Sequence, residues 1–438
     1  MPKGHDEEMR PFKIVHLTAY LDGGAGTAAY RINECLLKAG IDSTMLTTHT
    51  AHSAAYKNVL VQDISGHQYP LIPGFVEREK NRIRFRIKKH LGITMKPIRQ
   101  LLTELFKTTE PLLNCEIATI PFAEYDILKN PVVQNADIIH MHWVGAGMVD
   151  YPLFFSNNKK PVVWTLHDMN PFQGLFHYKE DEERNESVAQ KLDKQIAALK
   201  SRAIKKRKSD LIFVTPTDWL YNQAKQSSTF KNICGTCIAY PIDTSFFSPQ
   251  RALDLRKENN IKEGNVVFLF VAHAIKIYRK GFDILVDALS NLKHLNITLL
   301  VLGNCEYLEV QGLDVRLLGS IKDNDVLRNY YSMADAFIIP SREDNLPNVM
   351  LESLACGTPV IGFPVGGIKE HIVDYKTGML AKEISAGALA NAMEEFHTNK
   401  KAFDQDFIVS YAREHFSEQL IAAEYAKLYT KILAKNLN

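Results

Sequence analysis

Short apolar runs alternate with longer amphipathic stretches along this 438-residue chain, and this alternation restricts its fold more than any other feature. Runs rich in Val, Ile and Leu that are separated by helical patterns are typical of the buried parallel strands of βαβ units. The expected strands are residues 13–17, 43–47, 138–142, 162–167 and 211–215 in the first half, and 266–272, 297–303, 315–319, 336–340 and 359–362 in the second. Two such series predict an α/β protein with two Rossmann-like, doubly wound domains that face a central cleft.

The boundary between the two domains is expected near residues 240–251, where two prolines and small polar residues interrupt the periodicity. We therefore assign residues 1–245 to the first domain and 246–412 to the second. We expect residues 413–438 to form a C-terminal helix, because 413–437 have a helical pattern without Pro or Gly. The chain length agrees with two domains, since it exceeds that of one ordinary domain.

Composition argues against several classes of protein. Apolar residues make up 46% and charged residues 23%, which is an ordinary globular balance, and the net charge of +2 does not indicate a general nucleic-acid binder.

The six cysteines fit a reducing compartment, and the pair Cys234 and Cys237 has no second pair at zinc-finger spacing, so we expect no metal. The polar residues 1–12 are unlike a signal peptide, and no apolar run approaches the roughly 18 residues of a spanning helix. We expect a cytoplasmic protein.

The Gly-rich turn after the first expected strand is a candidate ligand site. Ligands of open α/β sheets bind beyond the carboxyl ends of the strands, and glycines let backbone amides approach a phosphate closely. Gly24, Gly26 and Ala29 match the G-x-G-x-x-A pattern of dinucleotide-binding proteins. However, the second expected strand ends in Thr47, Thr48, His49 and Thr50, without the acidic residue that would hold the ribose of NAD. The sequence therefore disfavours a dehydrogenase.

Histidines follow two further strands of the first half. His167 and Asp168 stand at a strand end followed by a turn, where they could transfer a proton or bind a polar substrate group. For His140 and His142 we favour the simpler interpretation of half-buried rings that bond backbone carbonyls. For His167 we favour a functional role at the cleft.

The second half supplies cations and carboxylates at strand ends. Lys276, Arg279 and Lys280 precede a helix that Gly281 opens, which suits a diphosphate, although a solvated charge run is the alternative. Asp344 and Glu352 follow the strand 336–340 with seven residues between them. Carboxylates accept hydrogen bonds from hydroxyls, so Glu352 could hold a ribose and Asp344 a sugar, while the amides from Asn345 and Leu346 onward could face a phosphate.

Together these motifs resemble the GT-B glycosyltransferases, specifically the retaining family 4 members that build bacterial capsules and exopolysaccharides. The resemblance covers nearly the whole chain. Its motifs are GGAG, WTLHDMNPF, YPIDTSFFSP, RKGFDIL and PSREDNLPNVMLESLACGTPVI, the last of which is the E-x7-E region of the family.

This resemblance implies transfer of a hexosyl group from a nucleotide-sugar donor to a glycan or lipid-linked glycan acceptor, with retention and without a required metal or other cofactor. It places Lys280 on the diphosphate, Glu352 on the ribose and Asp344 near the transferred sugar. Gly24, His167 and Asp168 would lie on the acceptor side, and the last helix would return to the first domain. His167, Asp344 and Lys280 are the candidate catalytic residues.

Three departures from the family pattern keep other activities open. Asp344 is one methylene shorter than the usual Glu, and Glu343 beside it leaves the register of the first acid open. Ala272 and His273 replace an expected Arg, and the cysteines that often follow WTLHDM are absent. The alternatives are a nucleotide-sugar epimerase of the same fold and a non-catalytic nucleotide-sugar-binding protein.

A basic run at residues 78–89 (REKNRIRFRIKK) interleaves cations with apolar side chains, with a pattern that fits a helix or a strand. Docking of residues 78–91 on an anionic lipid surface is one interpretation. A solvated insertion explains the run equally well.

Overall fold

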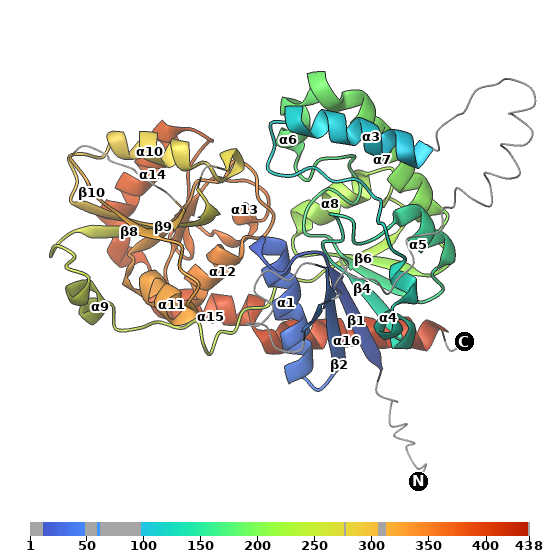
Figure 1. The fold of residues 1–438 in the computed structure, drawn as a ribbon. Helices are drawn as coiled ribbons and strands as arrows, with labels where there is room; N and C mark the ends of the chain where they lie inside the picture. The colour runs from blue at the N-terminus through green and yellow to red at the C-terminus, as the bar shows by residue number, and fades with distance from the viewer. Residues whose placement is uncertain (1–11, 49–58, 62–97, 276, 305–311, 437–438) are drawn as a thin grey trace, which may run out of the picture.

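The computed structural model describes residues 12–48, 59–61, 98–275, 277–304 and 312–436 (Figure 1). It contains two parallel sheets, each with helices on its faces, as predicted. The basic run at 78–91, His49 and Lys276 lie outside the described residues. Within the described part, no helix combines the length and the apolar character needed to cross a membrane.

The first sheet has the strand order β3-β2-β1-β4-β5-β6-β7. The order reverses between β1 and β4, which leaves a crevice beyond the carboxyl ends of these two strands. The strands are β1 (Lys13–Thr18), β2 (Asp42–Thr47), β3 (Val59–Val61), β4 (Ile138–Met141), β5 (Val162–Thr165), β6 (Leu211–Thr215) and β7 (Cys234–Cys237).

The second sheet has the order β10-β9-β8-β11-β12-β13, and its order reverses between β8 and β11. Arg279 and Lys280 follow β8, and Asp344 and Glu352 follow β11, so these candidate residues stand after the two strands at the reversal. The strands are β8 (Val266–Ala274), β9 (Ile297–Asn304), β10 (Asp314–Gly319), β11 (Ala336–Ile339), β12 (Val360–Gly362) and β13 (Gly378–Leu380).

Helices flank both sheets, and several of them also pack on one another. In the first half they are α1 (Gly23–Lys38), α3 (Ile98–Thr109), α4 (Pro131–Asn135), α5 (Tyr151–Asn157), α6 (Lys179–Arg184), α7 (Glu186–Lys205) and α8 (Asp218–Gln226). In the second half they are α9 (Ala252–Glu258), α10 (Phe282–Ser290), α11 (Asn324–Met333), α12 (Asn348–Ala355), α13 (Ile368–His371), α14 (Ala386–Asn399), α15 (Gln405–Phe416) and α16 (Glu418–Asn436).

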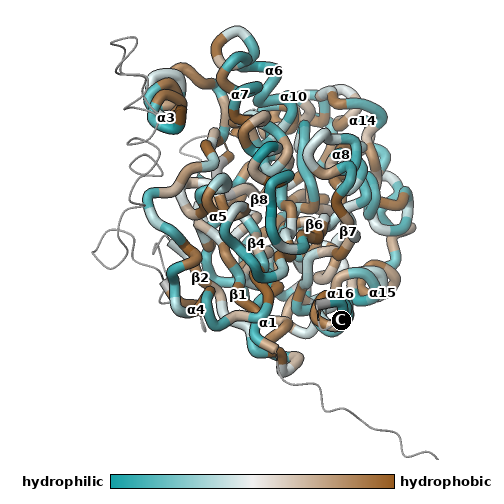
Figure 2. Tube along the Cα trace, turned by 90° about the vertical axis from the view of Figure 1, so that its right-hand side faces the viewer, coloured by the Kyte–Doolittle hydropathy of each residue, from teal (hydrophilic) through white to brown (hydrophobic). Residues whose placement is uncertain are grey.

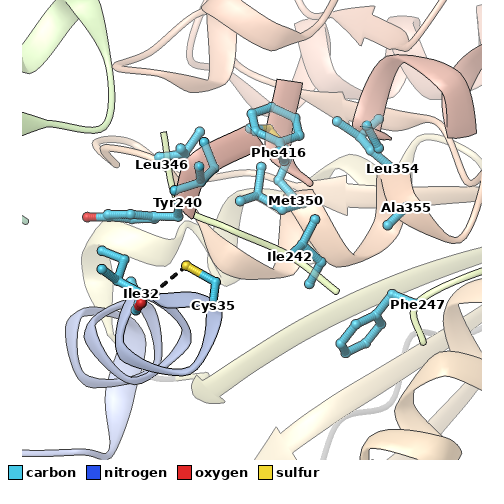
Figure 3. Packing of buried hydrophobic residues seen from close by; sticks show 14 of the residues in the cluster. Ile32, Cys35, Tyr240, Ile242, Phe247, Leu346, Met350, Leu354, Ala355 and Phe416 are labelled. Atoms are coloured by element: carbon cyan, nitrogen blue, oxygen red, sulfur yellow. Dashed lines mark hydrogen bonds between the residues drawn. The ribbon is translucent and has the colours of Figure 1, made fainter. Parts of the chain in front are cut away.

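One hydrophobic cluster continues from the first sheet into the second. It contains Ile14 and Val163 of the first sheet, Val267 of the second, and Met350 and Phe416 between them. Figure 3 shows the part of this cluster where α1 meets α12 and α15. The two domains therefore share buried apolar surface below the cleft.

The C-terminal segment differs from the single helix expected over 413–437. Ser417 has an extended backbone (ψ 143°) and separates α15 from α16, and it forms a β-bridge with Ile242 of the interdomain segment. α15 packs on α12 of the second domain and α16 on α1 of the first. Figures 1 and 2 show the two helices near α1, with α16 running beneath the first sheet.

Candidate active site

A cleft of about 1210 Å³ lies between the two domains and is lined by both. Its walls include the turn from β1 to α1, the segments after β4 and β5, the turn before α10 and the loop between β11 and α12. These are the carboxyl ends of the strands at the two reversals, where ligands of such sheets bind.

The Gly-rich turn brings α1 against the second domain. Gly23 has φ +81°, and a Cβ on Gly26 would lie 2.4 Å from the carbonyl of Leu21, so the turn requires glycine at both positions. The Gly24 carbonyl accepts a hydrogen bond from Asn348 Nδ2 at 2.8 Å. Gly24 therefore lies in the cleft, in contact with the start of α12.

Arg279 and Lys280, the two candidate phosphate-binding cations that the structure describes, meet Asp344 in the cleft. Lys280 Nζ lies 2.7 Å from Asp344 Oδ2, and an Arg279 Nη atom lies 3.3 Å from Asp344 Oδ1. Burial alone would raise the pKa of Asp344, but the charges of Lys280 and Arg279 lower it below its ordinary value. Asp344 is therefore an ionised carboxylate between two cations.

Arg279 also crosses to the first domain, where its guanidinium lies 2.8 Å from Glu116 Oε2. Arg279 is 8% exposed, and two carboxylates balance its charge. A diphosphate that binds at Arg279 and Lys280 would have to compete with Glu116 and Asp344 for these cations.

Glu352 on α12 is 5% exposed, and both of its carboxylate oxygens have polar partners. Arg31 on α1 lies 2.5 Å from Oε1, and the Tyr331 hydroxyl donates to Oε2 at 2.9 Å. The Glu352 carboxylate thus stands in the cleft beside the Gly-rich turn and is oriented by one residue from each domain.

The two neighbouring acids after β11 point in different directions. Glu343 accepts hydrogen bonds from the backbone N–H groups of Lys179 and Glu180 at the start of α6. Asp344 instead faces Lys280. In this structure Asp344 is therefore the cleft-facing acid that pairs with the cations.

Asn345 connects the loop between β11 and α12 to the first domain. Its Nδ2 donates to the His167 carbonyl at 3.0 Å, and its Oδ1 accepts from the Thr217 hydroxyl at 2.7 Å. Its backbone N–H donates to Asp344 Oδ1 at 3.1 Å, so this amide is engaged within the loop. Leu346 is buried at 3% exposure and also lines the cleft.

His167 and Asp168 line the opposite wall but have different partners. His167 Nδ1 lies 2.7 Å from the Tyr240 hydroxyl, and Asp168 Oδ2 lies 2.7 Å from His177 Nδ1. Burial lowers the pKa of His167 to about 4, against the opposing charge of Asp168. His167 is therefore a neutral imidazole at neutral pH.

The simple interpretation of His140 and His142 is wrong. Both rings are fully buried, and they bond side chains rather than backbone carbonyls. His140 contacts the Tyr429 and Thr165 hydroxyls at 2.6 and 2.8 Å, and His142 Nδ1 lies 3.1 Å from His167 Nε2. Neighbouring strands place these rings in one cluster with His16, and His142 connects that cluster to the cleft.

Among the described residues, His16, His140 and His142 are the one group with enough ligand atoms close together to hold a metal ion, all within 4.8 Å. Both nitrogens of His140 and of His142 are engaged in hydrogen bonds. A metal ion would have to replace several of these bonds. Cys234 and Cys237 lie on the edge strand β7.

The cleft residues that sequence reasoning missed include Arg31, Glu116, Tyr240 and His177. Arg31 and Glu116 meet their partners across 321 and 163 residues of chain, and neither belongs to a local motif. Tyr240 stands in the YPIDTSFFSP segment and His177 shortly after WTLHDMNPF, so proximity to these motifs was the available signal.

Comparison with known proteins finds similarity over parts of the chain. Residues 265–399 match the family model described as Glycosyl transferases group 1. The glycogen synthase of Thermodesulfovibrio yellowstonii is 28% identical over 170 residues, which are 36% of this chain and 34% of that protein. An uncharacterized 41.2 kDa protein in the cps region of Klebsiella pneumoniae is 24% identical over 317 residues, which are 69% of this chain and 81% of that protein.

The chain spans about a third to a half of the length of the curated relatives that match it first. Among solved structures, Alr3699/HepE of Anabaena in complex with UDP and glucose superposes with a TM-score of 0.61 over 96% of this chain and 99% of that chain. The sequence identity of this pair is 16%, so the likeness concerns the fold.

Proposed function

We propose that this chain, which has the GT-B fold, is a glycosyltransferase that moves a hexosyl group from a nucleotide-sugar donor to a glycan acceptor. The observation that carries this proposal is the convergence of Arg279, Lys280, Asp344 and Glu352 at the strand reversal of the second sheet, opposite His167 in the first domain. This arrangement offers cations for a diphosphate and carboxylates for hydroxyl groups within one cleft.

The second domain would hold the donor. Arg279 and Lys280 would contact the diphosphate, Glu352 the ribose hydroxyls and Asp344 the transferred sugar. The glycosidic bond to the diphosphate breaks to give a sugar with oxocarbenium character and a leaving group with additional negative charge. A preorganised donor aimed at such a charge contributes about 3 to 4 kcal/mol in measured enzymes, and Lys280 is placed to act in this way.

Donor binding would exchange ion pairs rather than fill an uncharged site. Without donor, Glu116 and Asp344 neutralise Arg279 and Lys280, while Arg31 occupies one oxygen of Glu352. The diphosphate would replace Glu116 at Arg279, and the ribose would share Glu352 with Arg31. The Arg279–Glu116 and Arg31–Glu352 pairs both join the two domains, so donor binding would also alter the contact between the domains.

The acceptor would lie along the first domain, beside the Gly24 turn, His167 and the Asp168–His177 pair. We infer retention of the anomeric configuration from the resemblance to family 4, with no covalent intermediate and no metal required. A role in surface polysaccharide synthesis, with a glycan or lipid-linked glycan as acceptor, is supported by the likeness to a protein of a cps region.

The experiment that tests this function is a thermal-shift panel with UDP, GDP, ADP and their glucose or mannose conjugates, without added metal. A ligand that binds the native state raises the melting temperature by mass action, so one nucleotide should do so selectively. The shift should be clearly smaller in Lys280→Ala and persist unchanged in Lys293→Ala, which removes an exposed lysine of the same domain. A flat panel, or a shift unchanged in Lys280→Ala, would contradict the proposed site. Sugar release or epimerisation without any acceptor would instead identify a hydrolase or an epimerase.

A further inference from the structure

A row of buried side chains runs from the cleft into the first domain. Tyr240 and His167 line the cleft, with the Tyr240 hydroxyl 2.7 Å from His167 Nδ1. His167 Nε2 lies 3.1 Å from His142 Nδ1, and His142 Nε2 lies 2.8 Å from His16 Nδ1. The four side chains thus form one unbranched hydrogen-bonded chain, which we call the imidazole chain.

The sheet brings the imidazole chain together from three strands. His16 on β1 is in register with His140 on β4, and His142 stands two residues further, so that its ring lies on the same face of the sheet. His167 follows β5, the next strand of the sheet. Tyr240 follows β7, and in Figure 3 its hydroxyl points away from the labelled apolar side chains around its ring.

All three imidazoles of the chain are neutral at pH 7. Burial lowers the pKa of His16 to about 3 and that of His142 well below its ordinary value, with nearby histidines adding to the second effect. The pKa of His167 is about 4, as described above. A neutral imidazole has one N–H donor and one bare nitrogen, so the hydrogen bonds of the chain must all run in the same direction.

Only two directions are therefore available, and they differ at the ends of the chain. If Tyr240 donates inward, each imidazole is protonated on Nε2, and the last N–H, on His16, lies in the interior. Among the residues that the structure describes, His16 Nε2 has no hydrogen-bond partner, and His16 is fully buried. Inward donation therefore leaves a buried N–H without an acceptor, which is a rare and costly arrangement.

If the chain runs outward, each imidazole is protonated on Nδ1 and no N–H is left unpaired. His16 donates to His142, His142 to His167, and His167 to the Tyr240 oxygen. The hydroxyl proton of Tyr240 is then free to point into the cleft, where water or a substrate can accept it. Hydrogen bonds in series also polarise one another, which makes the last donor stronger. The outward direction satisfies every donor of the chain.

We propose that His16, His142 and His167 keep the Tyr240 hydroxyl as a one-way hydrogen-bond donor to the sugar in the cleft. Tyr240 is the substrate-contacting residue of this arrangement, and His142 and His16 are positioning residues that act through it. The substrate group opposite Tyr240 must then be an acceptor, such as a sugar hydroxyl oxygen. Tyr240 lies within electrostatic range of Asp344 and Asp168. The sugar as ligand rests on the proposed function, whereas the direction of the chain does not.

The direction of the chain can be measured on the ligand-free protein. Two-bond ¹H–¹⁵N spectra of protein labelled with [¹⁵N]histidine distinguish Nδ1–H from Nε2–H rings. We expect Nδ1–H for His16, His142 and His167. Single His→Gln variants assign the signals, and Tyr240→Phe, which leaves all histidines in place, assigns His167 independently. An Nε2–H ring at His142 or His167, or a metal ion that copurifies in stoichiometric amount, would overturn the proposal.

The proposed donation from the Tyr240 hydroxyl to the substrate is tested by a double-mutant cycle. The cycle measures turnover of UDP-glucose, GDP-mannose or ADP-glucose, whichever the wild type uses. Tyr240→Phe and His142→Gln should each lower turnover by about tenfold, the change expected for one hydrogen bond. In the Tyr240→Phe background His142→Gln should have no further effect, because His142 acts through the hydroxyl. Additive losses would contradict this positioning role.

His140→Gln is the matched control, because His140 is equally buried and stacks on His142 but bonds Tyr429 and Thr165 instead. It should lower the melting temperature without showing coupling to Tyr240→Phe. If none of the three nucleotide sugars is turned over, the proposed function fails, while the NMR spectra still decide the direction of the imidazole chain.

Discussion

At the scale of single residues, the ion pairs of the cleft determine what a ligand has to replace. Lys280 is one of two cations on Asp344, and it is the proposed contact of the diphosphate. We expect Lys280→Ala to weaken binding of the preferred nucleoside diphosphate by about 10- to 100-fold, since a hydrogen bond to a charged group contributes about 1.5 to 3 kcal/mol. Isothermal titration calorimetry measures this change. Lys293→Ala should bind as the wild type does, and equal affinity in Lys280→Ala would exclude a diphosphate contact.

Substitution of Glu116 should have the opposite effect on nucleotide affinity. Its carboxylate pairs with Arg279 across the domains, and its side chain is 31% exposed, so the pair is partly screened by water. If the diphosphate binds at Arg279 as proposed, Glu116→Gln removes a competing anion, and we expect about threefold tighter nucleotide binding, most visible at low salt. Calorimetry at two ionic strengths measures this. Weaker binding in this variant would mean that Glu116 supports the site instead of competing for it.

At the scale of elements, Gly281 controls the turn that presents Arg279 and Lys280. It has φ +67°, and a Cβ there would lie 1.8 Å from the Pro340 carbonyl oxygen, so the turn before α10 can approach β11 only with glycine. We expect Gly281→Ala to lower the free energy of unfolding by more than about 2 kcal/mol and to weaken nucleotide binding, because the cations move with the turn.

Alanine substitutions at two other glycines, measured by urea unfolding, separate backbone strain from the contact with Pro340 as causes of the lower free energy of unfolding. Gly264 has φ +85° with nothing near its Cβ position, so Gly264→Ala reports backbone strain alone, about 1 kcal/mol. Gly387 lies in α14 with ordinary φ and open space, so Gly387→Ala should be neutral or stabilise by up to about 1 kcal/mol. Equal losses in Gly281→Ala and Gly264→Ala would show that the contact with Pro340 is unimportant.

The strands that the sequence missed share one position, because each lies at an edge of a sheet. All ten expected strands are present, because Val- and Ile-rich runs between helical patterns leave little alternative in a parallel sheet. The three missed strands, β3, β7 and β13, are short edge strands, and their pairing depends on the neighbouring strand. The break at Ser417 was missed for a similar reason, since its partner Ile242 lies 175 positions earlier.

The same distinction applies to the candidate site. Arg279, Lys280, Asp344 and Glu352 belong to local motifs at strand ends, and the fold brings them to one cleft as expected. Arg31 carries no such signal, because its role depends on the contact between α1 and α12. Local pattern indicates which residues reach a strand end, whereas the partner across the cleft follows only from how the domains meet.

At the scale of the whole molecule, the buried histidines make stability depend on pH. His16, His140, His142 and His167 are buried in the first domain, and Tyr429 of the crossing helix α16 bonds His140. Burial lowers the pKa of each, to about 3 for His16 and about 4 for His167. In the unfolded chain the same groups titrate near 6.5.

The folded state therefore binds fewer protons than the unfolded state below pH 6.5, and the stability of the protein falls as the pH falls. The full contribution of these neutral histidines to the free energy of unfolding is present above pH 6.5. It is lost progressively toward pH 4, by on the order of 1 kcal/mol per pH unit for each histidine. We expect the melting temperature to drop by several degrees between pH 7 and pH 5.5. His140→Phe should have a shallower slope whatever its melting temperature at pH 7, because one titrating group is removed. A melting temperature that stays constant over this interval would show that the four rings are not held neutral together, and would remove the basis for a one-way imidazole chain at the cleft.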